Sequence, residues 1–236
     1  MNIDTDTYEI CGFPEFLENT KEIMKWVKSL NRSEMQKLWA CNDQIADLNY
    51  ERFRDMDLEN GLTPAVISYE GIQYQYMAPG VFTQDAWEYV QEHLRILSGF
   101  YGCLKPMDGV VPYRLEMQAR LACDGFTNLY AFWNSLLYDE LVKDDGEVLN
   151  LASKEYSKAV EPYVKDGVRF VTCVFGTYVK GKLKVKATEA KMARGELVRL
   201  CAENNVQSVD EVKAYNVRGY VFNEELSSET EFVFVK

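Results

Sequence analysis

The residues best suited to chemistry are concentrated between Leu97 and Met117. Three glycines and two prolines in this stretch disfavour a regular helix and predict a rigid loop. The loop supplies one hydroxyl, two phenols, two cations and two carboxylates, on Ser98, Tyr101, Lys105, Asp108, Tyr113, Arg114 and Glu116. We expect this loop to form a site. The alternative is a surface connection whose charges are ordinarily solvated.

A second polar segment follows an apolar run and predicts the other half of the site. The segment Leu151–Glu155 has the character of a turn between a strand and a helix, which can offer backbone amides to an anion. Arginine matches phosphate geometry, and tyrosine faces can stack a base. The residues that suggest a phosphate or nucleotide site are Ser98, Lys105, Tyr113, Arg114, Glu116, Ser153, Lys154, Glu155, Tyr156, Lys191 and Arg194.

Two functions remain open for the acidic members of this set. Glu116 or Glu155 is a candidate general acid or base in an enzyme that acts on a nucleotide or nucleobase. Alternatively, Arg114 and Glu116, and Lys154 and Glu155, neutralise each other in a folded loop. Whether the protein is an enzyme therefore stays open, with a non-enzymatic function favoured.

Metal and cofactor chemistry finds little support in the residue types. His93 is the only histidine, and its helical spacing to Tyr89 and Leu97 favours a packed or capping imidazole. The cysteines lie far apart without a CxxC pair, so we expect reduced thiols, most of them in the core. They are Cys11, Cys41, Cys103, Cys123, Cys173 and Cys201. We expect no bound metal and no cofactor.

The charge of the chain is unevenly distributed. The net charge is −11, which argues against general affinity for nucleic acid. Between Lys154 and Arg199, however, eleven basic residues face five acidic ones, so this segment carries +6 and the remainder −17. Such asymmetry predicts a basic groove on an acidic body, the alternative being a solvated edge decorated with lysines. The candidate DNA-binding residues are Lys182, Lys184, Lys186, Lys191, Arg194 and Arg199.

Hydrophobic periodicity predicts several helices. The first spans Phe16 to Leu30, and a second follows a capping box at Ser33–Gln36 and continues to Arg52. Thr83 caps a helix that runs to Leu97. Two more cover 129–141 and 189–202, and in the last we expect Lys191, Arg194 and Val198 on one side, opposite Ala193, Leu197, Leu200 and Cys201.

Short apolar runs predict the strands. They are expected at 64–69, 147–151, 168–175, 182–187, 220–222 and 231–235, with 168–175 and 182–187 as a hairpin-like pair. Alternation along this pair predicts Lys182, Lys184 and Lys186 on one face. The irregular order of elements indicates a mixed α/β fold with α+β character. We expect a single domain over residues 1–236, with a mixed sheet flanked by helices.

The loop between Leu97 and Met117, which we call the signature loop, resembles the signature sequence of the YaaA-type peroxide stress resistance proteins. Further segments of this chain match that family in the same order, so the resemblance covers nearly the whole sequence. They are Leu129–Trp133, Leu149–Tyr156, Lys191–Arg199 and Tyr215–Phe222, followed by Ser227 and Phe232.

The resemblance implies a function. Members of the family take part in resistance to hydrogen peroxide, limit free intracellular iron and bind DNA through a basic cleft with a helix-hairpin-helix-like element. It implies roles for Ser98, Gly99, Tyr101, Gly102, Arg114 and Glu116, and for the basic residues Lys191, Arg194 and Arg199. We thus expect a stress protein of the cytoplasm that binds DNA weakly and without sequence preference, with no membrane association. A small anionic ligand or nucleotide is the other expected partner.

Family members usually begin with a short apolar strand and the sequence Ser-Pro-Ala-Lys. This chain begins at Met1-Asn-Ile-Asp4. We therefore expect the family's first strand and its lysine to be missing, and a start codon assigned too far downstream is the explanation we expect.

Overall fold

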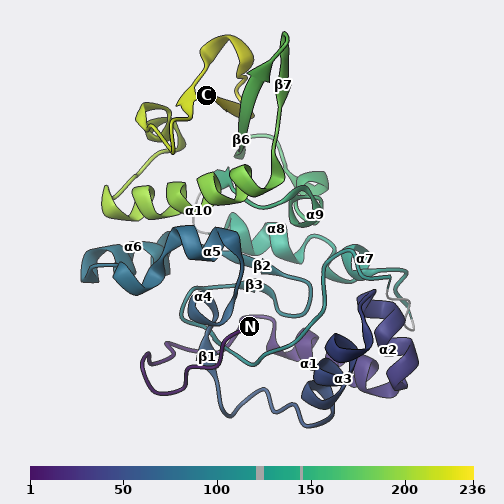
Figure 1. The fold of residues 1–236 in the computed structure, drawn as a ribbon. Helices are drawn as coiled ribbons and strands as arrows, with labels where there is room; N and C mark the ends of the chain where they lie inside the picture. Colours follow the sequence, from purple (N-terminus) through teal and green to yellow (C-terminus); the bar gives the residue numbers. More distant parts are fainter. Residues whose placement is uncertain (121–124, 144–145) are drawn as a thin grey trace. The chain divides into compact units, whose positions relative to one another are not determined.

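The protein is described by a computed structural model over residues 1–120, 125–143 and 146–236 (Figure 1). Its residues group into two units, each built from three separate stretches of sequence. The first unit comprises Met1–Tyr69, Arg95–Glu140 and Ala152–Tyr163. The second comprises Glu70–Leu94, Leu141–Leu151 and Val164–Lys236. The single domain expected over residues 1–236 stays a prediction.

The first unit begins with three helices, α1 (Leu17–Ser29), α2 (Arg32–Trp39) and α3 (Asp43–Arg54). The capping box lies at Asn31 and Glu34, not at Ser33 and Gln36: the Asn31 side chain accepts from the Glu34 amide at 3.1 Å, and Glu34 accepts from the Asn31 amide at 2.8 Å. The single helix predicted to Arg52 is also wrong. Ala40 has a left-handed φ of 45°, and the Asn42 side chain then caps α3.

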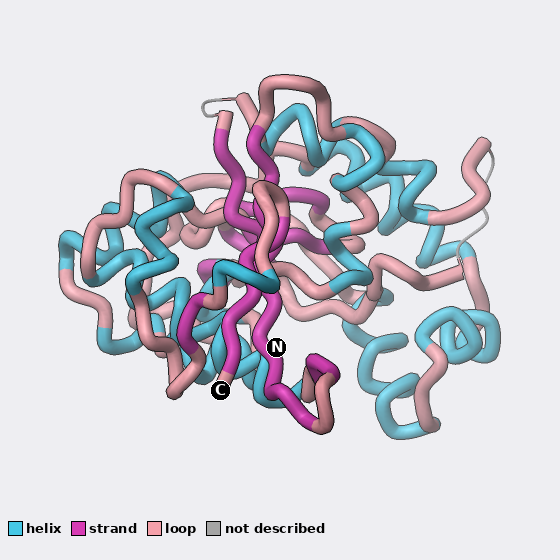
Figure 2. The backbone as a smooth tube through the Cα atoms, turned by 90° about the horizontal axis from the view of Figure 1, so that it is seen from above, coloured by secondary structure: helices cyan, strands magenta, loops and turns pink. Residues whose placement is uncertain are grey.

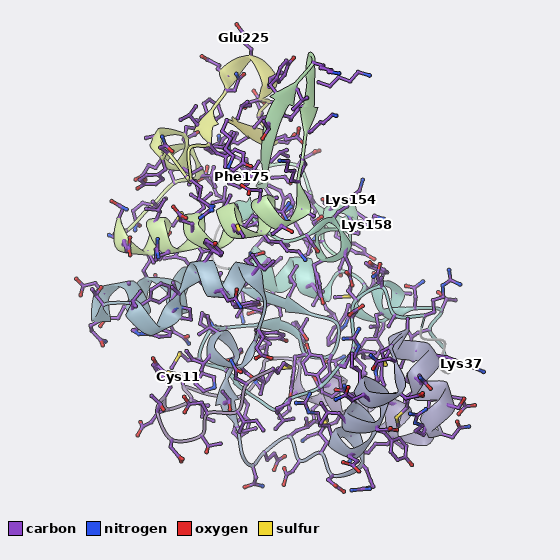
Figure 3. The ribbon with its side chains drawn as sticks, in the orientation of Figure 1. Cys11, Lys37, Lys154, Lys158, Phe175 and Glu225 are labelled. Carbon is purple, nitrogen blue, oxygen red and sulfur yellow. The ribbon has the colours of Figure 1, made fainter. Side chains whose placement is uncertain are left out.

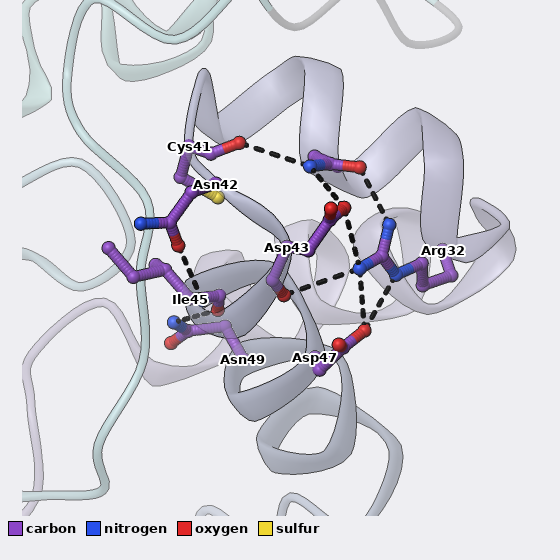
Figure 4. A network of polar contacts seen from close by, with 8 residues as sticks. Arg32, Cys41, Asn42, Asp43, Ile45, Asp47 and Asn49 are labelled. Carbon is purple, nitrogen blue, oxygen red and sulfur yellow. Dashed lines mark hydrogen bonds and ion pairs between the residues drawn. The ribbon is translucent and has the colours of Figure 1, made fainter.

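The turn between α2 and α3 is held by a polar network around Arg32 (Figure 4). Its guanidinium contacts Asp43 at 3.2 Å and Asp47 at 2.6 Å, and it donates to Gln36 at 2.6 Å. Hydrogen bonds to Asp47 raise the pKa of Arg32 above its ordinary value. The charge of Arg32 is therefore neutralised by carboxylates of α3.

The remainder of the first unit consists of short elements. Its strands are β1 (Thr63–Pro64), β2 (Ile96–Ser98), β3 (Gly102–Leu104) and β4 (Gly109–Val110), paired β1 with β4 and β2 with β3, all antiparallel. Its further helices are α4 (Ala65–Ser68), α7 (Leu129–Trp133), α8 (Leu136–Leu141), α9 (Lys154–Ser157) and η2 (Glu161–Tyr163). The stretch predicted as a loop, 97–117, thus contains most of three strands.

Two other predicted elements of the first unit are also wrong. The strand expected at 64–69 is mostly the helical turn α4, because four apolar residues fit one turn of helix as well as a strand. The helix expected at 129–141 is broken into α7 and α8 at Asn134, whose φ is 46°.

The second unit is built on a mixed five-stranded sheet, whose strands are drawn in magenta in Figure 2. The strands are β5 (Glu147–Asn150), β6 (Arg169–Val179), β7 (Lys182–Lys184), β8 (Val221–Phe222) and β9 (Glu231–Val235). The order is β5-β6-β9-β8, with β6 parallel to both β5 and β9, and β8 antiparallel to β9. The far end of β6 leaves this sheet and pairs antiparallel with β7.

Helices flank this sheet. They are α5 (Ile72–Met77), η1 (Pro79–Val81), α6 (Gln84–His93), α10 (Ala187–Glu203), η3 (Val209–Ala214) and η4 (Glu224–Leu226). Phe175, Phe232 and Phe234 from the strands are buried with Ala193 and Leu197 of α10, so the core lies between sheet and helix. The expected mixed α/β fold, with a mixed sheet flanked by helices, is confirmed. The hairpin at β6 and β7 is also confirmed, but β7 ends at Lys184 because α10 begins at Ala187.

Candidate functional site

The Ser98 hydroxyl organises the start of the signature loop in the first unit. Ser98 ends β2 and is 1% exposed. Its oxygen accepts hydrogen bonds from the amides of Phe100 at 3.1 Å and Tyr101 at 2.8 Å, which fixes the turn into β3. It also lies 2.6 Å from the Tyr113 hydroxyl. The oxygen predicted to bind a ligand is therefore engaged within the chain in this structure.

Tyr113 extends this contact into a chain of hydroxyls. Its oxygen lies 2.6 Å from that of Tyr69 as well as 2.6 Å from Ser98. Burial raises the pKa of Tyr113 well above its ordinary value, so the phenol stays protonated at neutral pH. We call Ser98, Tyr69, Tyr101, Tyr113 and Tyr156 the tyrosine cluster. Sequence analysis missed Tyr69, because no local pattern links it to a residue 44 positions away.

Tyr101 and the two signature glycines are held by packing. The Tyr101 hydroxyl accepts from the Val111 amide at 3.1 Å. A Cβ at Gly99 would lie 2.7 Å from the Leu115 carbonyl oxygen, and one at Gly102 would lie 2.8 Å from the Trp133 ring. Trp133 also donates its indole N–H to the Gly99 carbonyl at 3.1 Å. The structure thus gives these glycines a packing role, and their ligand-binding role stays a prediction.

The end of the signature loop meets α9. Arg114 donates to Glu116 at 2.9 Å, as in the alternative in which the two charges neutralise each other. Glu155 accepts from the Gln118 amide at 3.2 Å and forms no ion pair with Lys154 among the residues described. Burial raises the pKa of Tyr156, and the charges of Tyr113, Glu155 and Glu116 act in the same direction.

The structure therefore brings part of the predicted constellation together. Tyr113, Arg114, Glu116, Glu155 and Tyr156 are neighbours within the first unit. Ser153 precedes α9 without a side-chain cap, and Lys154 is exposed and points outward, as does Lys158 (Figure 3). Lys105 is exposed in the turn that leads to Asp108.

The other candidate residues lie in the second unit, on the hairpin formed by β6 and β7. The turn residues Lys180 and Gly181 have φ of 51° and 74°, which is typical of a two-residue hairpin turn. Register pairs Lys182 with Val179 and Lys184 with Thr177, so these two lysines share a face. We call the end of β6, the turn, β7 and the two residues before α10 the lysine hairpin. Its exposed lysines are Lys180, Lys182, Lys184 and Lys186.

The lysines of the hairpin form no close ion pair within the described ranges. None of the four forms an ion pair with any residue that the structure describes, and no acidic residue lies between Lys180 and Lys186. Tyr178 and Val185 are exposed beside them, 52% and 51% respectively. Sequence analysis identified three of these lysines but did not single out Lys180, which completes the alternating series.

The other predicted DNA-binding residues lie on helix α10 and differ in their exposure to solvent. Lys191 is exposed, but Arg194 and Arg199 are half-buried and Val198 is only 6% exposed. These three residues lie at helical spacing on one side of α10, as predicted, but only Lys191 on that side is exposed. The reason is α5, which packs against α10 so closely that a Cβ at Gly195 would collide with the carbonyl oxygen of Gln73.

The remaining ionisable groups form no recognisable metal site. Among the described residues, no group of three His, Cys, Asp or Glu side chains could hold a metal ion. The His93 ring packs on Tyr89 with centroids 4.4 Å apart, as predicted. Cys103, Cys173 and Cys201 are buried, Cys41 is half-buried and Cys11 is exposed, all as free thiols, and Cys123 lies outside the described residues.

No helix within the described ranges combines the length and apolarity required to cross a membrane.

Comparison with known proteins now decides the family. The family model described as "Peroxide stress protein YaaA" matches residues 1–226. The chain belongs to the YaaA family of peroxide stress proteins. It is 49% identical to a UPF0246 protein of Pediococcus pentosaceus over 236 residues, covering 100% of this chain and 94% of the relative.

Other relatives agree. A UPF0246 protein of Limosilactobacillus reuteri is 49% identical over 235 residues, covering 99% of this chain and 94% of that protein. One from Lachnoclostridium phytofermentans is 52% identical over 227 residues, 96% of this chain and 89% of the relative. The predicted family is thus confirmed, and both units, with the tyrosine cluster and the lysine hairpin, belong to this YaaA-family chain.

Proposed function

We propose that this protein acts in peroxide stress by associating with DNA through the lysine hairpin and by limiting free intracellular iron. The observation that carries the DNA part is the set of four exposed lysines that form no ion pair with any described residue. On a chain of net charge −11, charges of one sign kept together and unpaired favour a polyanion as partner.

The geometry of the hairpin fits a nucleic-acid backbone without base recognition. Lysine is a flexible point charge that follows phosphates but does not form a rigid fork. Lys186 precedes α10 without a side-chain cap, so the first amides of this helix add positive character beside the lysines. These features support weak binding that is insensitive to sequence, with Lys191 as an outlying contact.

The test compares two variants with the same change in charge. One replaces Lys180, Lys182, Lys184 and Lys186 with glutamine. The control replaces four other exposed lysines, Lys25, Lys37, Lys105 and Lys158. Fluorescence anisotropy with a labelled duplex should show that the hairpin variant loses most of its affinity and that the control loses much less. Equal losses in both variants would mean that only net charge matters, and the hairpin would then not be the DNA contact.

The iron part of the proposal follows from the family resemblance and the family's description as a peroxide stress protein. We place the protein in the cytoplasm, where free thiols such as its five described cysteines persist. Electron paramagnetic resonance of chelatable iron, in cells with and without the gene, tests this part. More free iron in cells without the gene is expected; an equal signal after peroxide treatment would contradict it.

A second candidate function is supported by the neighbours of Tyr156. Arg114, Glu116 and Glu155 gather there, which suits an enzyme acting on a nucleotide or nucleobase with one carboxylate as general acid or base. An unbiased mass-spectrometric search for ligands of the purified protein tests this alternative. A retained nucleotide that disappears in an Arg114→Ala variant would favour it over the DNA-associated function.

A further inference from the structure

Arg194 in α10 carries a positive charge that the described residues do not neutralise. Its side chain is half-buried, and its Nε is shielded from solvent without a hydrogen-bond partner. No hydrogen bond or ion pair joins its side chain to any residue described. Arg114, Arg199 and Arg218 also have a buried Nε without a partner, but each has a glutamate within 2.9, 3.7 and 3.6 Å respectively.

A guanidinium that is partly shielded from water loses part of its hydration. Burial lowers the pKa of Arg194, which means that its surroundings disfavour the charged form. Arginine nevertheless keeps its proton in proteins, so the charge remains. Buried charges are normally paired with a counter-ion, because taking an ion out of water costs several kcal/mol. No described carboxylate lies within ion-pair distance of Arg194.

The place of Arg194 on α10, beside the sheet, suggests where a counter-ion would lie. Arg194 is close enough to Cys173 of β6 for the two groups to interact electrostatically. Cys173 directly follows Thr172, which pairs with Asn150, the last residue of the parallel strand β5. Arg194 therefore lies at the level where β5 ends. In open sheets with parallel strands, ligands bind just outside the carboxyl ends of the strands.

Helix α5 links the end of β5 to α10. Gln73 of α5 donates from Nε2 to the carbonyl of Leu151, the residue after β5, at 3.3 Å. Gly195, next to Arg194, lets α10 approach the backbone of α5 at Gln73. The end of β5 is thus tied to α5, and α5 packs on α10 at the residue next to Arg194, all within the second unit.

We propose that Arg194 binds one oxyanion of a small ligand, a phosphate or a carboxylate group, at the carboxyl end of β5. The planar guanidinium offers paired N–H donors that match either group. This site is separate from the exposed lysine hairpin and does not depend on the DNA proposal. Arg194 is accordingly an oxyanion-binding residue instead of a direct DNA contact.

The test uses inorganic phosphate and malonate as probes on the full chain. Isothermal titration calorimetry should detect saturable binding of at least one of them to the wild type. Arg194→Gln should weaken it by about 10- to 100-fold, the loss expected for a charged hydrogen bond. Arg194→Lys should recover only part of the affinity, because it lacks the fork. The probe that binds more tightly identifies a phosphate or a carboxylate ligand.

Two controls separate this site from other effects. Arg199→Gln, on the same helix but near Glu203, should bind the probe as the wild type does. The variant without the hairpin lysines should also keep the small-anion site while losing DNA. Binding of small anions at Arg194 is therefore tested separately from DNA binding by the hairpin.

A measurement on the wild type covers the case in which Arg194→Gln does not fold. The arginine Nε–H resonances, observed by NMR, should include one that moves on addition of the probe, because the Arg194 Nε has no protein partner. Absence of any saturable binding or Nε–H shift with both probes would overturn the proposal. Unchanged binding in a folded Arg194→Gln variant would also overturn it.

Discussion

The tyrosine cluster and the lysine hairpin use their polar groups in opposite ways. In the cluster, Ser98 and Tyr113 are buried and their hydroxyls are engaged with each other and with the backbone. In the hairpin, Lys182 and Lys184 are exposed and form no ion pair within the described ranges. The difference separates residues that hold a loop in place from residues that are free to meet a partner.

Substituting one glycine in each region should give the largest contrast. Gly99→Ala places a Cβ 2.7 Å from a backbone oxygen, which cannot move as a flexible side chain can. We expect a loss of about 3 kcal/mol in unfolding free energy. Gly181→Ala meets no atom within 4 Å and strains only a φ of 74°, so a loss of about 1 kcal/mol is expected. Denaturant unfolding compares them; similar losses would contradict the difference in packing.

The first unit also contains a buried carboxylate, whose titration should affect stability next most strongly. Asp108 is 6% exposed and accepts from the Lys105 amide at 2.8 Å. Burial raises its pKa to about 6, against the lowering effect of that hydrogen bond. Because the folded pKa is raised above the unfolded value, the folded state binds more protons between about pH 4 and 6. Stability from this group therefore falls as pH rises through that window.

Asp108→Asn should remove this loss while keeping an oxygen acceptor for the Lys105 amide. We expect it to stabilise the protein by roughly 2 kcal/mol at pH 7 and to change stability little at pH 4. Asp210 in the second unit supplies the opposite control, because hydrogen bonds from Arg169 and Lys213 lower its pKa. Asp210→Asn should remove stability that is present at neutral pH and is lost as pH falls below about 4. Parallel pH profiles for the two variants would refute these assignments.

Removing one hydroxyl of the cluster should have a smaller effect. Ser98→Ala leaves the buried amides of Phe100 and Tyr101 without their acceptor, so we expect a loss of about 1.5 kcal/mol. Tyr113→Phe removes the other hydroxyl of the 2.6 Å contact. A double-mutant cycle on the two should show coupling, because they share that contact. Additive losses would indicate that the two hydroxyls act independently.

The hairpin lysines should matter least for stability. Exposed side chains without partners contribute little to the folded state, so replacing all four with glutamine should change the unfolding free energy by less than about 0.5 kcal/mol. Thermal and denaturant unfolding measure this. A marked destabilisation would mean that the lysines stabilise the fold instead of being available to bind a partner.

Local patterns in the sequence were enough to predict the second unit's sheet elements. Alternation along 182–187 predicted the hairpin, and the apolar run at 147–151 predicted β5, because both signals depend only on neighbouring residues. The short run at 64–69 was misread, since its length does not distinguish strand from helical turn. Asn134 broke a predicted helix through a left-handed φ that the pattern could not reveal.

The sequence predicted which residues make up the candidate site, but not the contacts that their polar groups form. The signature residues and α9 were expected together, and Tyr113 does lie near Tyr156. The engagement of the Ser98 hydroxyl and its link through Tyr113 to Tyr69 depend on contacts distant in sequence. The close packing of α5 on α10 at Gly195 also involves residues distant in sequence, which the periodicity of α10 alone cannot show.

The salt dependence of DNA binding tests the central claim most directly. Each phosphate contact contributes about 0.9 to the slope of log affinity against log salt concentration. If the hairpin lysines are the contacts, replacing all four with glutamine should reduce the slope by about 3 to 4, whereas the control with four distant lysines should keep it. An unchanged slope in the hairpin variant would contradict the claim that this hairpin carries the DNA association.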